Sequence, residues 1–216
     1  MFRYDSKLMQ ILGKVADLMI INIWTILCSL PLITMGASLT AMHYAVSCCV
    51  RDIGDSCTGN FFKSFRINFK TATIAWLFEL PACALIVLDW YSIMFLQAKL
   101  SDSMSFWLVI CQFLIIAFVT WFFGLQAHYQ NSLLSTAKNT LILMLSHPLI
   151  TIAMVLVQTA PFWLSLLVTG TMPLALIFGC SGPVMFSSLM YRRVFTRIEK
   201  KKAEYAAQEQ EKTGTA

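Results

Sequence analysis

Two carboxylates lie in one of the most apolar stretches of this 216-residue sequence, and they are the first candidates for chemistry. Glu79 and Asp89 are the only charged residues between positions 71 and 96. A charge is costly in an apolar environment, so such a residue is a candidate for proton transfer by default. Ten residues separate the two, so they do not share one face of a helix. A proton-coupled role for Glu79 therefore competes with a structural carboxyl, either protonated or hydrogen-bonded to Ser or Asn.

Histidine and cysteine supply the other groups that could bind a metal or react. None of the histidines has a second histidine three or four residues away or a carboxylate in register, so we expect helix-end hydrogen bonding instead. The cysteines lack the spacing of a metal or redox site, and we interpret them as reduced, apolar packing residues. Acylation of those near the membrane surface stays open. We expect no catalytic, cofactor-binding or metal-binding residue. The histidines discussed are His43, His128 and His147, and the cysteines are Cys28, Cys48, Cys49, Cys57, Cys83, Cys111 and Cys180.

Motifs that carry common chemistries are absent from the sequence. It has no phosphate-binding loop, no His-Glu-x-x-His, no Gly-x-Ser-x-Gly and no dinucleotide fingerprint. The basic cluster at 192–202 has no accompanying nucleic-acid motif, and acidic residues balance the end of the chain. The sequence therefore predicts neither an enzyme nor a nucleic-acid-binding protein.

The composition indicates the environment in which these groups lie. Apolar residues make up 58% of the chain and charged residues 12%, against about 45–50% and 25% in a soluble domain. A water-soluble domain of this size could not bury so much apolar surface. Because one crossing needs about 20 residues, we predict an all-α, polytopic membrane bundle of about six transmembrane helices in the lipid bilayer. The predicted crossings are residues 15–33, 36–52, 71–96, 104–126, 147–168 and 173–192.

The distribution of basic residues predicts the orientation. With six crossings and a cytoplasmic N-terminus, fifteen of the sixteen Lys and Arg residues lie inside, and only Lys99 lies outside. If 36–52 did not cross, the best arrangement would place twelve inside and four outside. We therefore expect both termini in the cytoplasm. Residues 1–198 would form a single integral membrane domain, and 199–216 a polar cytoplasmic tail. Asp89, beside Trp90 and Tyr91, would then lie at the outer interface.

Two segments have patterns that predict contacts. Ala37, Ala41 and Ala45 recur every four residues, a spacing that lets helix backbones approach closely, and they predict a packing face. Residues 57–70 place four phenylalanines on one face of a helix and three bases on or beside the other. Such a segment is typical of an anchor at an anionic inner leaflet. The alternative is a docking surface for a cytoplasmic partner.

Two stretches of the sequence carry a family resemblance. One is Asn-Ile-Trp at 22–24 followed by Leu-Pro-Leu-Ile-Thr-Met-Gly at 30–36, and the other is Phe-Phe-Lys-Ser-Phe-Arg-Ile-Asn-Phe-Lys-Thr-Ala-Thr at 61–73. They resemble the YesL-like family of bacterial integral membrane proteins, whose function is unknown, over about residues 1–200. Ala37 stands where many relatives have proline after the glycine, a minor departure.

The resemblance implies a multi-pass protein of the bacterial plasma membrane with an accessory role in carbohydrate uptake. It supplies no catalytic or binding residues. Our leading hypothesis is a non-enzymatic accessory component whose partner is a carbohydrate ABC transporter or another membrane subunit. The alternative hypothesis is a small transporter or channel with Glu79 in its pathway. That alternative predicts a polar cavity beside Glu79.

Overall fold

Every regular element among the described residues is helical, which confirms the all-α fold. The computed structural model describes residues 7–53, 56–95, 102–129, 131–168 and 178–214. The elements are α1 (Lys7–Ser29), η1 (Leu32–Thr34), α2 (Met35–Arg51), α3 (Cys57–Phe95), α4 (Asp102–His128), α5 (Leu133–Ser146), α6 (Pro148–Leu167) and α8 (Ser181–Gly214).

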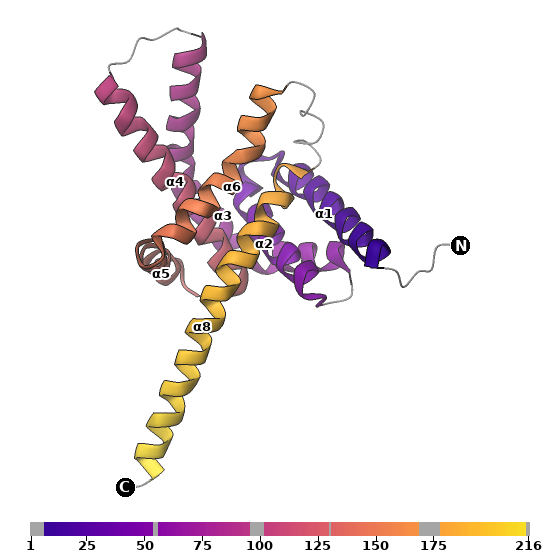
Figure 1. Cartoon of the computed structure of the whole chain (residues 1–216). Helices are drawn as coiled ribbons and strands as arrows, with labels where there is room; N and C mark the ends of the chain where they lie inside the picture. Colours follow the sequence, from indigo (N-terminus) through magenta and orange to yellow (C-terminus); the bar gives the residue numbers. More distant parts are fainter. Residues whose placement is uncertain (1–6, 54–55, 96–101, 130, 169–177, 215–216) are drawn as a thin grey trace.

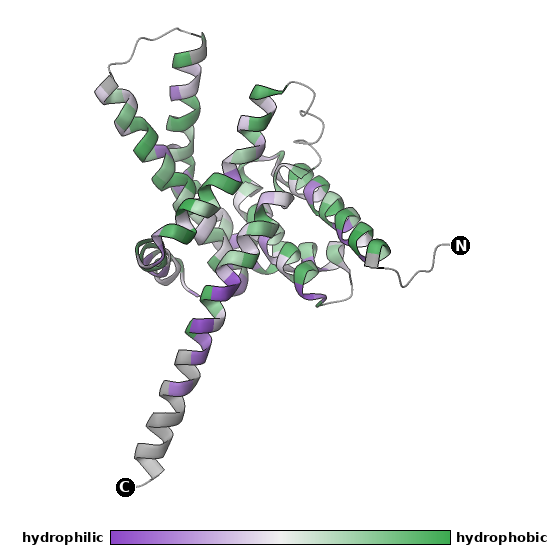
Figure 2. Cartoon of the chain, in the orientation of Figure 1, coloured by the Kyte–Doolittle hydropathy of each residue, from purple (hydrophilic) through white to green (hydrophobic). Residues whose placement is uncertain are grey.

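The described helices identify a multi-pass membrane protein. Five of them are long and apolar enough to cross a membrane, namely α1, η1 with α2, α3, α4 and α6. Figure 2 shows that apolar residues run along α1, α3, α4 and α6, and many of them are exposed, where a bilayer would contact them. A backbone in hydrocarbon must satisfy its own hydrogen bonds, which an α-helix does within one segment.

The helix boundaries agree with three of the predicted crossings and differ at the others. The predicted 36–52, 104–126 and 147–168 correspond closely to α2, α4 and α6. The predicted 71–96 is the second part of α3, which begins at Cys57, so the amphipathic segment 57–70 and the crossing form one helix. The sequence analysis did not predict α5.

Two further boundaries have a local cause. The first helix ends at Ser29 rather than at residue 33, because Pro31 cannot donate the backbone hydrogen bond that would continue it. The sixth predicted crossing, 173–192, begins within 169–177, which lies outside the described residues. Its described part is the start of α8, which continues without a break to Gly214. The predicted polar tail is therefore the second half of this helix.

Helix α2 lies at the centre of the described bundle. Ala37, Ala41 and Ala45 are fully buried, which confirms the predicted packing face. At Gly36, an added Cβ would lie 2.5 Å from the Ala72 carbonyl oxygen and 2.5 Å from the Cβ of Trp76. Small residues thus bring the backbones of α2 and α3 into direct contact.

The turn between α1 and α2 is fixed by hydrogen bonds to backbone carbonyls. The hydroxyl of Thr34 donates to the Cys28 carbonyl at 2.6 Å, and the indole of Trp76 donates to the Leu32 carbonyl at 2.7 Å. The second bond joins α3 to η1. The turn between α1 and α2 is therefore held by α1, which precedes it, and by α3, which follows α2.

Polar side chains also join helices that are distant in sequence. The side-chain oxygen of Asn22, buried on α1, accepts hydrogen bonds from the backbone N–H groups of Cys180 and Ser181 at 3.1 and 3.2 Å. The first N–H groups of a helix have no partner within the helix. Asn22 therefore caps the start of α8 from another element.

The phenylalanine face of 57–70 has a different environment from the one predicted. Phe61 is fully buried and packs in a core with Leu18 of α1 and Ala45 of α2, whereas Phe69 is exposed. Trp24 meets Phe62 edge-on, with ring centroids 4.9 Å apart. This face therefore anchors α3 to the first hairpin, and the part of it that faces outward is small.

Figure 1 shows the overall arrangement of these helices. The end of α3 and the start of α4 extend on one side of the molecule, and the second half of α8 extends on the opposite side. The short helix α5 joins α4 to α6. The polar side chains described next gather where α2, α4 and α8 meet.

Candidate functional site

A polar cavity of about 250 Å³ lies between the end of α2, the end of α4 and the middle of α8. Residues of α8 reach it from successive turns, because positions three and four apart share one face of a helix. Its lining residues are Ser47, Val50, Arg51, His128, Ser188, Arg192, Phe195, Thr196 and Glu199.

Tyr191 lies behind two of the lining residues, Ser47 and His128. This residue is fully buried, and its hydroxyl is 3.2 Å from the hydroxyl of Ser47 on α2. The ring of His128 packs edge-on against it, with centroids 5.4 Å apart. Gly124 leaves room for the ring, since a Cβ there would lie 3.4 Å from Tyr191 Cε1. The cavity thus ends at a closely packed aromatic group.

The charge of the cavity is mainly basic. Arg51 and Arg192 line it together with a single carboxylate, that of Glu199, which accepts a hydrogen bond from the hydroxyl of Tyr129 at 3.0 Å. Burial and the Glu199 carboxylate raise the pKa of Tyr129 to about 12, so this hydroxyl stays a donor at neutral pH. Guanidinium groups bind phosphate and carboxylate in a fork geometry. The arrangement is suited to an anionic group at the membrane surface.

The histidines have two different environments. His128 makes the expected helix-end bond, with Nδ1 3.0 Å from the Gly124 carbonyl oxygen. His147 lies at the junction of α5 and α6, where its backbone N–H donates to the Leu143 carbonyl. His43 differs from the prediction. It is buried in the middle of α2, and its Nδ1 has no hydrogen-bond partner among the described residues.

The two carboxylates of α3 are not brought together. Asp89 accepts a hydrogen bond from Gln112 of α4 at 3.1 Å, so it joins α3 and α4; its place at the outer interface stays a prediction. One carboxylate oxygen of Glu79 is buried without a hydrogen-bond partner in the described part of the chain. Glu79 lines none of the four cavities that we describe. None of these four cavities is therefore the polar space beside Glu79 that a transport pathway predicts.

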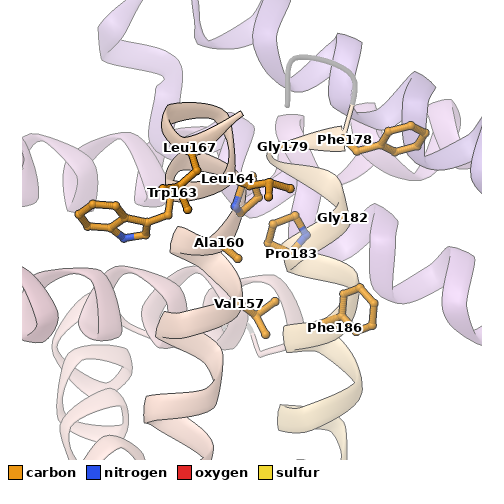
Figure 3. A pocket seen from close by; sticks show the side chains of 11 residues that line it. Val157, Ala160, Trp163, Leu164, Leu167, Phe178, Gly179, Gly182, Pro183 and Phe186 are labelled. Carbon is orange, nitrogen blue, oxygen red and sulfur yellow. The ribbon is translucent and has the colours of Figure 1, made fainter. Parts of the chain in front are cut away.

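Two larger cavities are apolar. One, of about 670 Å³, lies between α3, α4 and α6, and Trp90, Phe95 and Phe162 contribute to its wall. The other, of about 640 Å³, lies between α6 and the start of α8 and is lined by aliphatic, aromatic, glycine and proline residues. Figure 3 shows Ala160 of α6 and Pro183 of α8 in the space between the two helices, and Gly182 also lines it. Cavities of this kind take up apolar chains or side chains.

The cysteines are all free thiols. Two of them lie close to each other and to a carboxylate, which their spacing in the sequence does not reveal. Cys49, near the end of α2, and Cys57, the first residue of α3, lie beside Asp17 of α1. The thiol of Cys49 is 4.0 Å from a carboxylate oxygen of Asp17. The eight-residue spacing of the two cysteines matches no ligand motif. In the sequence, the signal for this cluster was that the two cysteines lie on either side of the short connection between α2 and α3.

Comparison with known proteins locates a family match in the first part of the chain. Residues 18–90 match the family described as protein of unknown function, DUF624. This range runs from α1 through most of α3 and contains both sequence motifs described above. No curated protein and no solved structure matches the chain.

Proposed function

We propose that this protein is a non-enzymatic accessory component of the bacterial plasma membrane that associates with a carbohydrate-uptake system. Its partner is a membrane subunit, such as that of a carbohydrate ABC transporter. The family resemblance of the first hairpin and of the 61–73 segment implies the link to carbohydrate uptake. The single observation that carries an accessory role is the apolar cavity between α6 and α8 (Figure 3).

The shape of this cavity supports a helix as its occupant. Small residues, Ala160 on α6 and Gly182 on α8, lie between larger apolar groups such as Trp163 and Phe186. Small residues permit close approach of helix backbones within a membrane, where association depends on packing. Its volume of about 640 Å³ leaves room for several side chains of a partner helix.

The use of polar groups supports a structural role over a catalytic one. Gln126 of α4 accepts a hydrogen bond from Thr136 of α5 and donates one to Thr71 of α3. The indole of Trp121 donates to the hydroxyl of Thr151 at 3.0 Å. These side chains hold helices together, so they are not available as an acid, base or nucleophile. We favour this function over transport because Glu79 lines none of the four cavities described among the residues that the structure covers.

Co-purification of the tagged full-length chain from native membranes tests the proposal. We expect quantitative mass spectrometry to recover membrane subunits of a carbohydrate transporter. Ala160→Phe should reduce that recovery because it fills the cavity. Leu156→Phe is the matched control, since Leu156 lies on the same helix but outside the cavity and is exposed. Recovery without any transporter subunit, or equal recovery with both variants, would refute the proposed association.

A further inference from the structure

Ligand atoms from three helices meet where α2 ends and α3 begins. Asp17 on α1, Cys49 on α2 and Cys57 on α3 each offer one atom, and these atoms lie within 4.8 Å of one another. The thiol of Cys49 donates a long hydrogen bond to a carboxylate oxygen of Asp17 at 4.0 Å. The three groups thus already face one point.

The spacing of these atoms fits a tetrahedral metal ion. Zinc binds sulfur at about 2.3 Å and carboxylate oxygen at about 2.0–2.2 Å, so neighbouring ligand atoms lie about 3.5–3.8 Å apart. The thiol of Cys49 is 4.0 Å from the Asp17 oxygen, and no pair exceeds 4.8 Å. The ligand atoms must therefore approach one another by up to about 1 Å to reach these distances.

The ligand types select the metal. Thiolates are soft ligands that favour zinc, whereas magnesium and calcium prefer sites built of oxygen. Cys49 is buried, and the other two groups are half-buried. The site is therefore shielded enough to hold an ion and open enough to admit one.

A fourth cavity provides an entry path to the carboxylate of Asp17. It has a volume of about 450 Å³ and is lined by Gln10, Gly13, Lys14, Asp17 and Asp52. The charge of Lys14 is compensated within it, because its ammonium group forms an ion pair with Asp52 at 3.0 Å. A fourth coordination position on this side would face water.

We propose that Asp17, Cys49 and Cys57 form a zinc site in which water occupies the fourth position. The ion joins α1, α2 and α3 at one end of the bundle. Binding releases the protons of the two thiols, because only the thiolate is a ligand. The site is independent of the proposed association with a carbohydrate-uptake system.

Cobalt is the probe for the first experiment, because thiolate ligands give it a charge-transfer absorption that zinc lacks. The purified, reduced, metal-free chain in detergent is titrated with Co²⁺ and then with Zn²⁺. We expect one cobalt ion per chain, a thiolate charge-transfer band, and loss of that band when zinc replaces cobalt. A titration without this band would overturn the proposal, and it requires no variant to fold.

Substitutions then assign the ligands. Cys49→Ser and Cys57→Ser should each weaken zinc binding by more than about 100-fold, because changes outside the direct ligands already cost 10–100-fold. Cys48→Ser is the matched control, since Cys48 is buried next to Cys49 and lies outside the cluster. Equal affinity of Cys49→Ser and Cys48→Ser would place the ion elsewhere and refute the assignment.

Alkylation of the unmodified chain provides a second readout if a variant does not fold. Zinc should protect Cys49 and Cys57 from a maleimide and leave the modification of Cys111, which is exposed, unchanged. Mass mapping of the labelled peptides identifies the protected thiols. Zinc-independent labelling of Cys49 and Cys57 would contradict the proposed site.

Discussion

Single residues in this protein decide how closely its helices approach. The clearest case is Gly36, where the α3 backbone leaves no space for a side chain. Asn22 acts differently, because it supplies one oxygen to two backbone donors at the start of α8. The sequence marked both residues as parts of a motif. Their physical roles depend on contacts 36 and about 158 residues away, which no local pattern contains.

Gly36→Ala should destabilise the protein. The added Cβ would meet the Ala72 carbonyl oxygen and the Trp76 Cβ at 2.5 Å, so α2 and α3 must separate. Overpacking of this kind costs about 1–3 kcal/mol. Thermal unfolding in detergent measures the effect. Gly13→Ala is the control, because nothing lies within 4 Å of its added Cβ, and it should be neutral or stabilising. Equal stability of the two variants would refute the close contact.

Asn22→Ala should weaken the attachment of α8 to α1. It removes the acceptor of the N–H groups of Cys180 and Ser181, and a buried donor left without a partner costs about 1–3 kcal/mol. Hydrogen exchange over the first turn of α8 should rise, together with a lower unfolding temperature. Asn131→Ala, at an exposed position before α5, serves as the control. Unchanged exchange in the Asn22 variant would show that the cap contributes no stability.

At the scale of helices, the sequence predicted the features that repeat along a whole crossing. It did not predict the features that depend on contacts with neighbouring helices. The stripe of alanines on α2 follows from a regular spacing, and its burial confirms it. The 57–70 segment was separated from the crossing because its bases suggested an interface, but the chain continues as one helix. Helix α5 was missed because its 14 residues are too few for a crossing and include Lys138.

The candidate sites show the same division. Arg192 and Glu199 were visible only as part of a basic cluster and a polar tail, and the polar cavity arises where α8 crosses α2 and α4. Cys49 and Cys57 lacked a ligand spacing in sequence, and Asp17 joins them only after three helices pack. Sites built from one residue per helix leave no periodic signal. They become recognisable only when the packing is known.

Helix α5 should depend on Gln126 for its position. This side chain accepts a hydrogen bond from Thr136 at 3.2 Å and donates one to Thr71 at 3.3 Å, so it links α5 to α3 through α4. Gln126→Leu should cost about 0.5–1.5 kcal/mol for each hydrogen bond lost, because the hydroxyls of Thr136 and Thr71 keep their bonds to the backbone carbonyls of Ser132 and Asn68. Hydrogen exchange of α5 measures the loosening. Asn139→Leu, on the exposed face of α5, should leave exchange unchanged. Equal exchange in both variants would argue against the link.

At the scale of the whole molecule, helix lengths and charges must agree with one placement in the bilayer. Helix α3 has 39 residues, a length of about 58 Å at 1.5 Å per residue, which exceeds the roughly 30 Å hydrocarbon core. Its first part carries the exposed Lys63, Arg66 and Lys70, so that part lies outside the hydrocarbon. The polar half of α8 extends away from the far end of α3 (Figure 1). The basic end of α3 and the C-terminal end of α8 therefore belong on one side.

This placement predicts the accessibility of two connections. Epitope tags inserted at 53–58 and at 97–103 should be reached from opposite sides of the membrane, with the first on the side of the C-terminus. The reason is electrostatic, because the six-crossing arrangement would place Lys99 alone on one side and the other fifteen basic residues on the opposite side. Protease protection of tags in right-side-out and inverted vesicles measures this, with a C-terminal tag as the reference. If both tags were reached from one side, α2 would not cross, and the twelve-to-four distribution of the five-helix arrangement would be the correct one.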